Sequence, residues 1–213
     1  MVHTLYYLLK TARPRQWLKN VAVYAALVFS GFFFYQFPLY FFRVTGAFFA
    51  FTLVSSGIYI INDIVDRDSD RKHPYKKRRP IASGDLPIQT AAIGAVILLG
   101  SGLLVSWMLS PFLAVILAGY FALQLAYSYT LKHIAILDVL TIAAGFILRV
   151  YAGAVVVNLH MSVWFLLTVV SASLFLAIGK RQSERTLMTA QAEGALSTRK
   201  SLAKYSTRLL DIY

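Results

Sequence analysis

The chain has 213 residues, of which 58% are hydrophobic and 14% are charged, whereas soluble domains carry roughly 25% charged residues. This balance argues against a soluble domain and indicates a membrane protein. The net charge is +12, but the bases gather between apolar runs, so their distribution argues against a nucleic-acid partner. The absence of cysteine excludes disulfides and thiolate metal sites.

The first nine residues predict a short helix lying on the membrane surface, with Leu5, Leu8 and Leu9 as its apolar contacts. Pro14 is expected to end or kink this helix. The first ten residues lack the basic start and the long apolar core of a signal peptide, so we expect them to be mature sequence.

Six apolar runs of about 20 residues follow, the length that crosses a hydrocarbon core about 30 Å thick. They are Val21–Phe37, Val44–Ile61, Ile88–Leu109, Phe112–Tyr129, Ile134–Val157 and Val163–Ile178. Residues 205–213 resemble the start of a seventh helix. We therefore expect an all-α, multi-pass transmembrane bundle with six complete spans, forming a single membrane-embedded domain over residues 1–213.

Basic residues occur mainly in every second connection between the predicted spans and are rare in the others. Four precede the first predicted span, seven lie between the second and third, and seven follow the sixth, whereas Arg43 alone lies between the first and second. Cytoplasmic loops hold the excess of Lys and Arg. This alternation predicts that the amino terminus and residues 66–87 lie in the cytoplasm.

Acidic residues gather where the second predicted span ends. At about 100° per residue, Asn62, Asp63, Asp66 and Asp70 share one arc of a helix about 100° wide, while Asp68 points away from it. Clustered carboxylates repel unless cations neutralise them, and oxygen ligands suit Mg²⁺ bound together with a substrate phosphate. We predict that Asn62, Asp66 and Asp70 bind Mg²⁺ and that residues 66–87 form an active-site loop for a diphosphate, because long loops are usually functional or disordered.

The spacing Asn62-Asp63-x-x-Asp66-x-x-x-Asp70 resembles the first aspartate-rich motif of the UbiA-type intramembrane prenyltransferase superfamily. Within that superfamily the chain is similar to the bacterial decaprenyl-phosphate phosphoribosyltransferases. The similar segments are RPRQWLKN (13–20), HPYKKRRPIASG (73–84), LKHIAILDVL (131–140), LRVYAGA (148–154), GKRQSE (179–184) and RKSL (199–202). The resemblance implies a UbiA-type helical bundle in the bacterial inner membrane, with Asn62, Asp63, Asp66 and Asp70 at a cytoplasmic Mg-diphosphate site.

The chain departs from the superfamily in two respects. Members that transfer prenyl groups generally have a second aspartate-rich motif, where this sequence has Lys180 and Arg181. These bases also have the spacing to pair with Glu184 on a helix surface. The family has about nine membrane helices, so a chain that stops at the start of the seventh is expected to be truncated.

Bases in place of acids favour a donor with an additional phosphate, because Lys and Arg bind phosphate oxygens directly. The resemblance then implies transfer of the 5-phosphoribosyl group from phosphoribosyl diphosphate to a polyprenyl phosphate, with loss of diphosphate. The lipid phosphate could be guided by Lys19, Arg15, Lys132 or Arg149, and we prefer Lys19 because the family-like segment RPRQWLKN places it at the membrane edge. The predicted substrate-binding residues are Lys19, Lys76, Lys77, Arg78, Arg79, Lys132, Asp138, Lys180 and Arg181.

The fifth predicted span carries two charged residues, Asp138 and Arg149, which lie about 16 Å apart along a helix, too far to pair. Charged groups inside a membrane are functional candidates by default. We expect Asp138 to line the site, while Arg149 either guides the lipid phosphate or satisfies backbone carbonyls. Tyr127 and Tyr129 are interpreted as interfacial anchors.

Two other functions remain open. Prenyl transfer from a prenyl diphosphate to an aromatic or other small acceptor fits the superfamily but is disfavoured by the missing second acidic motif. A transporter would place ionisable groups near the bilayer midplane, whereas most charges here crowd one membrane edge.

Overall fold

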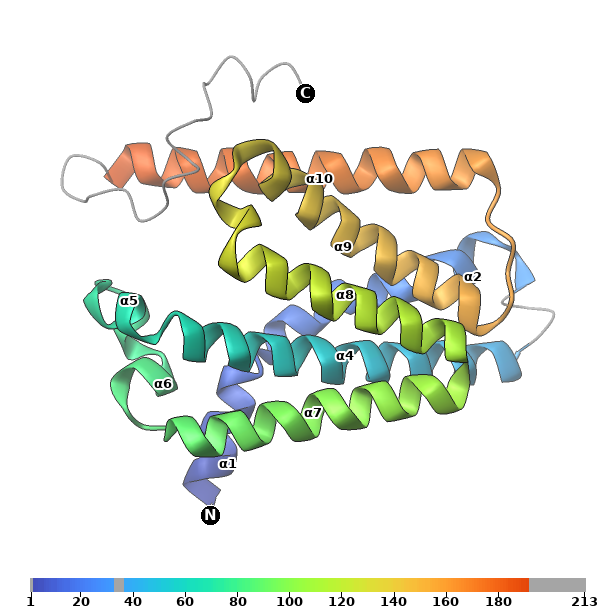
Figure 1. Ribbon diagram of the computed structural model, residues 1–213. Coiled ribbons are helices and arrows are strands. Elements are labelled where there is room, and N and C mark those ends of the chain that lie inside the picture. Colours follow the sequence, from blue (N-terminus) through green and yellow to red (C-terminus); the bar gives the residue numbers. More distant parts are fainter. Residues whose placement is uncertain (1, 33–36, 192–213) are drawn as a thin grey trace. The chain divides into compact units, whose positions relative to one another are not determined.

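The computed structural model describes residues 2–32 and 37–191. Its regular elements in this part of the chain are all helices (Figure 1). In chain order they are α1 (Val2–Thr11), η1 (Pro14–Tyr24), α2 (Ala25–Phe29), α4 (Leu39–Val65), α5 (Arg67–Lys72), η2 (Lys76–Arg78), α6 (Pro80–Ser83), α7 (Ile88–Leu109), α8 (Pro111–Tyr129), η3 (Leu131–His133), α9 (Ala135–Val156) and α10 (Val163–Gln191). The expected seventh helix lies outside the described residues.

Five of the six predicted spans are confirmed as helices within the described residues. The segments long and apolar enough to cross a membrane are Leu39–Val65, Ile88–Leu109, Pro111–Tyr129, Ile136–Val156 and Val163–Ser183. The protein is therefore a multi-pass membrane protein with an all-α fold. The expectation of one domain over residues 1–213 stays a prediction.

The first predicted span, Val21–Phe37, is not confirmed. Its amino-terminal part belongs to the 3₁₀-helix η1, the five-residue helix α2 follows, and residues 33–36 lie outside the described part. Side-chain hydrogen bonds join η1 to α4. Trp17 donates to Ser56 at 3.0 Å, and Tyr24 donates to Thr45 at 2.8 Å. Hydropathy cannot reveal such polar pairing.

Small residues bring α4 and α7 together, and Figure 1 shows the two helices side by side. A Cβ added at Gly102 would lie 3.0 Å from the carbonyl oxygen of Ala50, and one at Gly57 would lie 3.1 Å from that of Ala95. Close backbone approach through small residues is typical of membrane helices, where packing replaces the hydrophobic effect. This contact packs α4 against α7, and the candidate site lies at the carboxyl end of α4.

The chain folds into two compact units. One comprises Met1–Phe121 with Arg149–His160, and the other comprises Ala122–Leu148 with Met161–Tyr213. In the first, Gly153 of α9 packs on η1 so closely that an added Cβ would lie 1.7 Å from the carbonyl oxygen of Val23. In the second, α9 and α10 share a core of Val139, Ala143 and Ala177.

The segment between α4 and α7 is folded. Pro80 begins α6, Gly84 ends it with a φ of 93° that favours glycine, and the amide of Leu86 donates to the carbonyl of Pro80 at 2.9 Å. Ile81 and Leu86 are buried with Ile60 of α4. These contacts hold α6, and with it Arg79, beside the end of α4.

Candidate functional site

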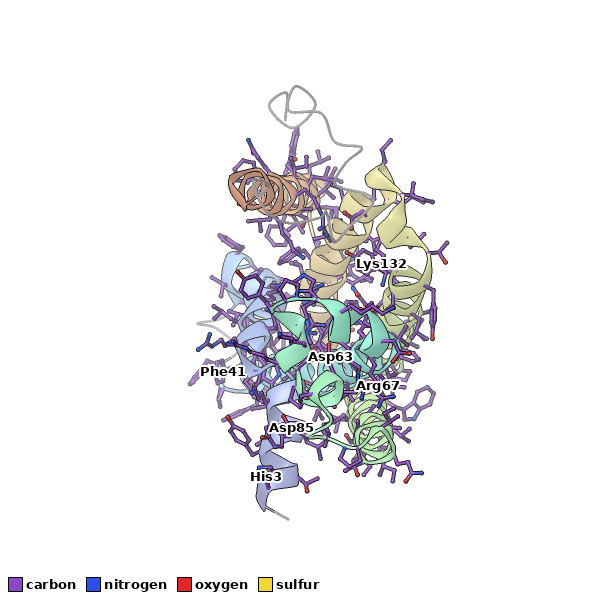
Figure 2. All side chains as sticks on the ribbon, turned by 90° about the vertical axis from the view of Figure 1, so that its left-hand side faces the viewer. His3, Phe41, Asp63, Arg67, Asp85 and Lys132 are labelled. Atoms are coloured by element: carbon purple, nitrogen blue, oxygen red, sulfur yellow. The ribbon has the colours of Figure 1, made fainter. Side chains whose placement is uncertain are left out.

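Two buried aspartates share one arginine at the end of α4. Nη1 of Arg79 donates to Oδ1 of Asp63 at 3.1 Å and to Oδ2 of Asp70 at 2.7 Å. Asp63 is 3% exposed and Asp70 is 2% exposed. Like charges this close would repel, so the guanidinium between them stabilises both carboxylates. Figure 2 looks onto this end of the molecule and labels Asp63 among the side chains there.

A second arginine reaches the same carboxylate. Nη2 of Arg13, at the junction of α1 and η1, forms an ion pair with Oδ1 of Asp63, and the guanidinium lies over the ring of Tyr59, 5.3 Å from its centroid. Arg13 has a φ of 55°, in the left-handed region. A non-glycine residue there is uncommon, and such strain clusters at functional sites. Sequence reasoning did not include Arg13 among the site residues, although its RPRQWLKN segment was noted.

The remaining acids continue the arc predicted for a helix. The amide of Asp66 donates to the carbonyl of Asn62 at 2.9 Å, and that of Asp70 donates to the carbonyl of Asp66 at 2.8 Å, so the helical turn carries on from α4 into α5. Asp66 and Asn62 are half-buried, and Asp68 is exposed. The buried Oδ1 atom of Asn62 accepts no hydrogen bond from the described residues.

These donors fit Mg²⁺, although the described residues contain no ready-made group of three His, Asp or Glu side chains that could hold a metal. Magnesium usually takes only one or two carboxylates and completes its shell with water and substrate phosphates. Asn62 offers a buried amide oxygen that accepts no hydrogen bond within the described part of the chain, and Asp66 lies one turn further on. The donor set is therefore all oxygen, as a hard cation requires.

His73 organises the turn into η2. Its Nδ1 atom accepts hydrogen bonds from the amides of Tyr75 and Lys76, at 3.2 and 3.3 Å, so this nitrogen carries no proton. The pKa of His73 lies below its ordinary value, first because partial burial disfavours the charged ring and then because Lys76 repels it. A neutral ring therefore supports the turn that presents the basic residues.

Most of the predicted substrate-binding bases of the first unit are exposed. Exposed side chains belong to Lys19 on η1 and to Lys76, Lys77 and Arg78 on η2, whereas Arg79 is half-buried. In the second unit, Lys132 on η3 is half-buried and Lys180 on α10 is exposed. Their roles in binding substrate stay predictions.

Arg181 has a different environment from the one expected. Its Nε atom lies 2.6 Å from Oδ2 of Asp138 and its Nη2 atom 3.0 Å from Oδ1, and both side chains are fully buried. Tyr127 donates to Oδ1 of Asp138 at 2.9 Å and accepts from Arg181 at 3.1 Å. The hydroxyl of Tyr127 thus joins this buried pair, and its role as an interfacial anchor stays a prediction. Phosphate binding by Arg181 stays a prediction, and it would require the guanidinium to leave Asp138; the side chain of Glu184 lies outside the described part.

Arg149 lies in the interior of the first unit and has side-chain partners there. It donates from Nε to Oδ1 of Asn20 at 2.9 Å and from Nη2 to the hydroxyl of Tyr120 at 2.8 Å. Its guanidinium also lies over the ring of Phe51, 5.1 Å from the centroid. Asn20 in turn donates to Thr52 of α4 at 3.0 Å. Sequence reasoning missed Asn20, and its only signal was a polar residue within the RPRQWLKN segment.

The chain matches the UbiA prenyltransferase family over residues 21–202 and belongs to that family. A decaprenyl-phosphate phosphoribosyltransferase of Mycolicibacterium smegmatis is 44% identical over 206 residues, which cover 95% of this chain and 64% of the relative. The chain thus spans less than two thirds of the length of that relative.

Two solved structures share the fold. A digeranylgeranylglyceryl phosphate synthase has a TM-score of 0.74 at 20% identity, with 100% of this chain and 72% of that chain covered. A UbiA homolog from Archaeoglobus fulgidus, solved with DMAPP and Mg²⁺, has a TM-score of 0.67 at 21% identity, with 84% of this chain and 62% of that chain covered. The recognised family and the UbiA-type fold are therefore confirmed.

Proposed function

We propose that this protein transfers the 5-phosphoribosyl group of phosphoribosyl diphosphate to the phosphate of a polyprenyl phosphate and releases diphosphate. The observation that carries the proposal is the 44% identity to the phosphoribosyltransferase of Mycolicibacterium smegmatis along 95% of the chain. The cluster of Asp63, Asp70 and Arg79 at one end of α4 supports a site for an anionic donor. The site and the amino terminus face the cytoplasm, as the distribution of bases favours.

The reaction exchanges one C–O bond for another at C1 of the ribose. The bond to the diphosphate breaks with its electron pair on the leaving oxygen, and an oxygen of the lipid phosphate donates a pair to C1. The lipid phosphate is already an anion near neutral pH, so the step needs no strong general base. What it needs is stabilisation of negative charge on the leaving group, which is often the largest contribution to catalysis.

Several residues near the end of α4 would stabilise the negative charge of the leaving diphosphate. Asn62, Asp66 and Asp70 would hold Mg²⁺, which neutralises charge on the diphosphate when bound. Arg79 donates from Nη1 to both Asp63 and Asp70, and its guanidinium has further N–H donors for phosphate oxygens. The bases of η2 precede Arg79 and add positive charge for the donor. Lys19 on η1 guides the lipid phosphate toward the donor, because two anionic substrates otherwise repel each other.

The basic second motif supports a phosphoribosyl donor over a prenyl donor. Lys180 stands where superfamily members that transfer prenyl groups generally have an acid, and its side chain is exposed on α10. An exposed ammonium can bind the 5-phosphate of the donor directly, whereas an acidic residue would require another metal ion. Lys132 on η3 adds a second base from the same unit.

The test measures diphosphate release by the full-length protein in lipid vesicles with two substrate pairs. Phosphoribosyl diphosphate with polyprenyl phosphate should give turnover, whereas a prenyl diphosphate with an aromatic acceptor should give none. Addition of EDTA should abolish the release, and excess Mg²⁺ should restore it. Turnover with the second pair alone would overturn the phosphoribosyl assignment and favour a prenyltransferase.

A further inference from the structure

A buried asparagine joins η1 to two other helices. The side chain of Asn20 is 1% exposed, and its Nδ2 atom donates to the hydroxyls of Thr52 and Ser55 on α4, at 3.0 and 3.2 Å. Its Oδ1 atom accepts a hydrogen bond from Nε of Arg149 on α9 at 2.9 Å. Because arginine can only donate, this contact fixes which end of the amide faces α9 and which end faces α4. Asn20 therefore holds η1 to both helices at once.

Arg149 meets η1 together with a second residue of the same face of α9. Gly153 follows Arg149 by one turn of α9, and a Cβ added there would collide with the carbonyl oxygen of Val23. Val23 in turn follows Asn20 by one turn of η1. The hydroxyl of Tyr120 on α8 accepts from Nη2 of Arg149 at 2.8 Å, so the guanidinium is held from another side as well. One face of α9 thus packs against one face of η1 over two successive turns.

The residue before Asn20 is Lys19, the base that we expect to guide the lipid phosphate. Neighbouring residues of a 3₁₀-helix point about 120° apart, so Lys19 is exposed although Asn20 is buried. Trp17, two residues before Lys19, donates to Ser56 of α4 at 3.0 Å. The ammonium of a lysine stands on a flexible stem of four carbons, so its position depends on how well the backbone beneath it is fixed. The contacts of Trp17 and Asn20 fix the backbone on both sides of Lys19.

We propose that Arg149 is a positioning residue for the acceptor: it holds Asn20, and thereby sets where Lys19 presents its ammonium to the phosphate of the lipid. Arg149 is only 5% exposed, so it acts through Asn20 and not by touching the phosphate. Its loss should therefore weaken the use of the lipid acceptor and leave the use of the donor unchanged. The role of Lys19 rests on the proposed function, whereas the contact between Arg149 and Asn20 does not.

The first test measures the KM of the full-length protein in lipid vesicles for polyprenyl phosphate and for phosphoribosyl diphosphate. Arg149→Lys keeps the charge but removes the Nε donor to Asn20. The acceptor KM should rise about three- to tenfold, because one charge-assisted contact is lost while the bonds of η1 to α4 remain, and the donor KM should change less than about twofold.

Tyr120→Phe is the matched control, because it removes the other hydrogen bond of Arg149 and leaves the one to Asn20. It should leave the acceptor KM within about twofold of its original value, since a neutral hydroxyl partner contributes little and the contact to η1 persists. Equal rises in Tyr120→Phe and Arg149→Lys would overturn the proposal, as would a fall in kcat alone with both KM values unchanged. Either result would mean that Arg149 only supports the fold.

The second test combines Arg149→Lys with Lys19→Gln. If Arg149 acts through Lys19, the double variant should have the same acceptor KM as Lys19→Gln alone, because no ammonium is then left to position. If the two changes instead multiply, Arg149 acts on the acceptor by another route, and the proposal fails.

Hydrogen exchange of the backbone amides supplies a measurement that does not depend on catalysis. The amides of residues 17–20 should exchange faster in Arg149→Lys than in the unmodified protein, whereas those of α1 should be unchanged. If too little Arg149→Lys folds for kinetics, Asn20→Asp keeps an acceptor for Arg149 but loses both donors to α4, and it should also raise the acceptor KM. An unchanged acceptor KM in Asn20→Asp would count against the positioning of Lys19.

These measurements separate the inference from the proposed function. Failure of phosphoribosyl transfer by the unmodified protein, together with faster exchange of residues 17–20 in Arg149→Lys, would reject the proposed function and retain the hold of Arg149 on η1. Normal transfer by the unmodified protein, together with unchanged exchange in Arg149→Lys, would reject this inference and retain the function.

Discussion

The buried ion pair of Asp138 and Arg181 predicts how much folding stability is lost when one partner is removed. Both side chains are fully buried, and the guanidinium meets the carboxylate through two contacts of 2.6 and 3.0 Å. Arg181→Met would leave the Asp138 carboxylate buried with the hydroxyl of Tyr127. Removal of one partner of a buried pair typically costs about 3–5 kcal/mol, which is more than a hundredfold in the folding equilibrium.

The assay is reversible unfolding of the full-length protein in mixed detergent micelles, followed by circular dichroism. Asp138→Leu should destabilise as strongly as Arg181→Met, whereas the double variant should recover most of the loss, because no buried charge then remains without its partner. Lys180→Met, an exposed neighbour on α10, should change stability by less than about 0.5 kcal/mol. Additive losses in the double variant would refute the reasoning, since they would show that the two side chains do not interact.

Three further predictions address the metal, the membrane orientation and pH. Asp66→Asn should abolish Mg²⁺-dependent turnover while Asp68→Asn, whose side chain is exposed, should retain it; equal loss would contradict the helical-face argument. A cysteine at Lys76 should be labelled from the cytoplasm and one at Pro38 from the other side, because α4 separates them, and labelling from one side would contradict the predicted topology. The pKa of His73, followed by NMR, should lie below 6.5, so its contribution to stability is present above pH 6.5 and is lost as pH falls toward the lowered value; a value above 6.5 would contradict this.

The sequence by itself determined the features that depend on neighbouring residues. A span through lipid requires about 20 consecutive apolar residues, so five helices could be found from hydropathy. The spacing of Asn62, Asp66 and Asp70 follows from helical periodicity, and it singled out the end of α4. The family, too, was recognised from short motifs.

Only the tertiary structure decided which charges meet. Arg13 and Asp63 are far apart in the sequence, and so are Asp138 and Arg181, and no local periodicity links either pair. The same holds for η1, whose polar side chains bond to Ser56 and other hydroxyl-bearing residues of α4. In an apolar interior a polar group must find a partner wherever the fold supplies one, and that choice depends on the packing of distant helices.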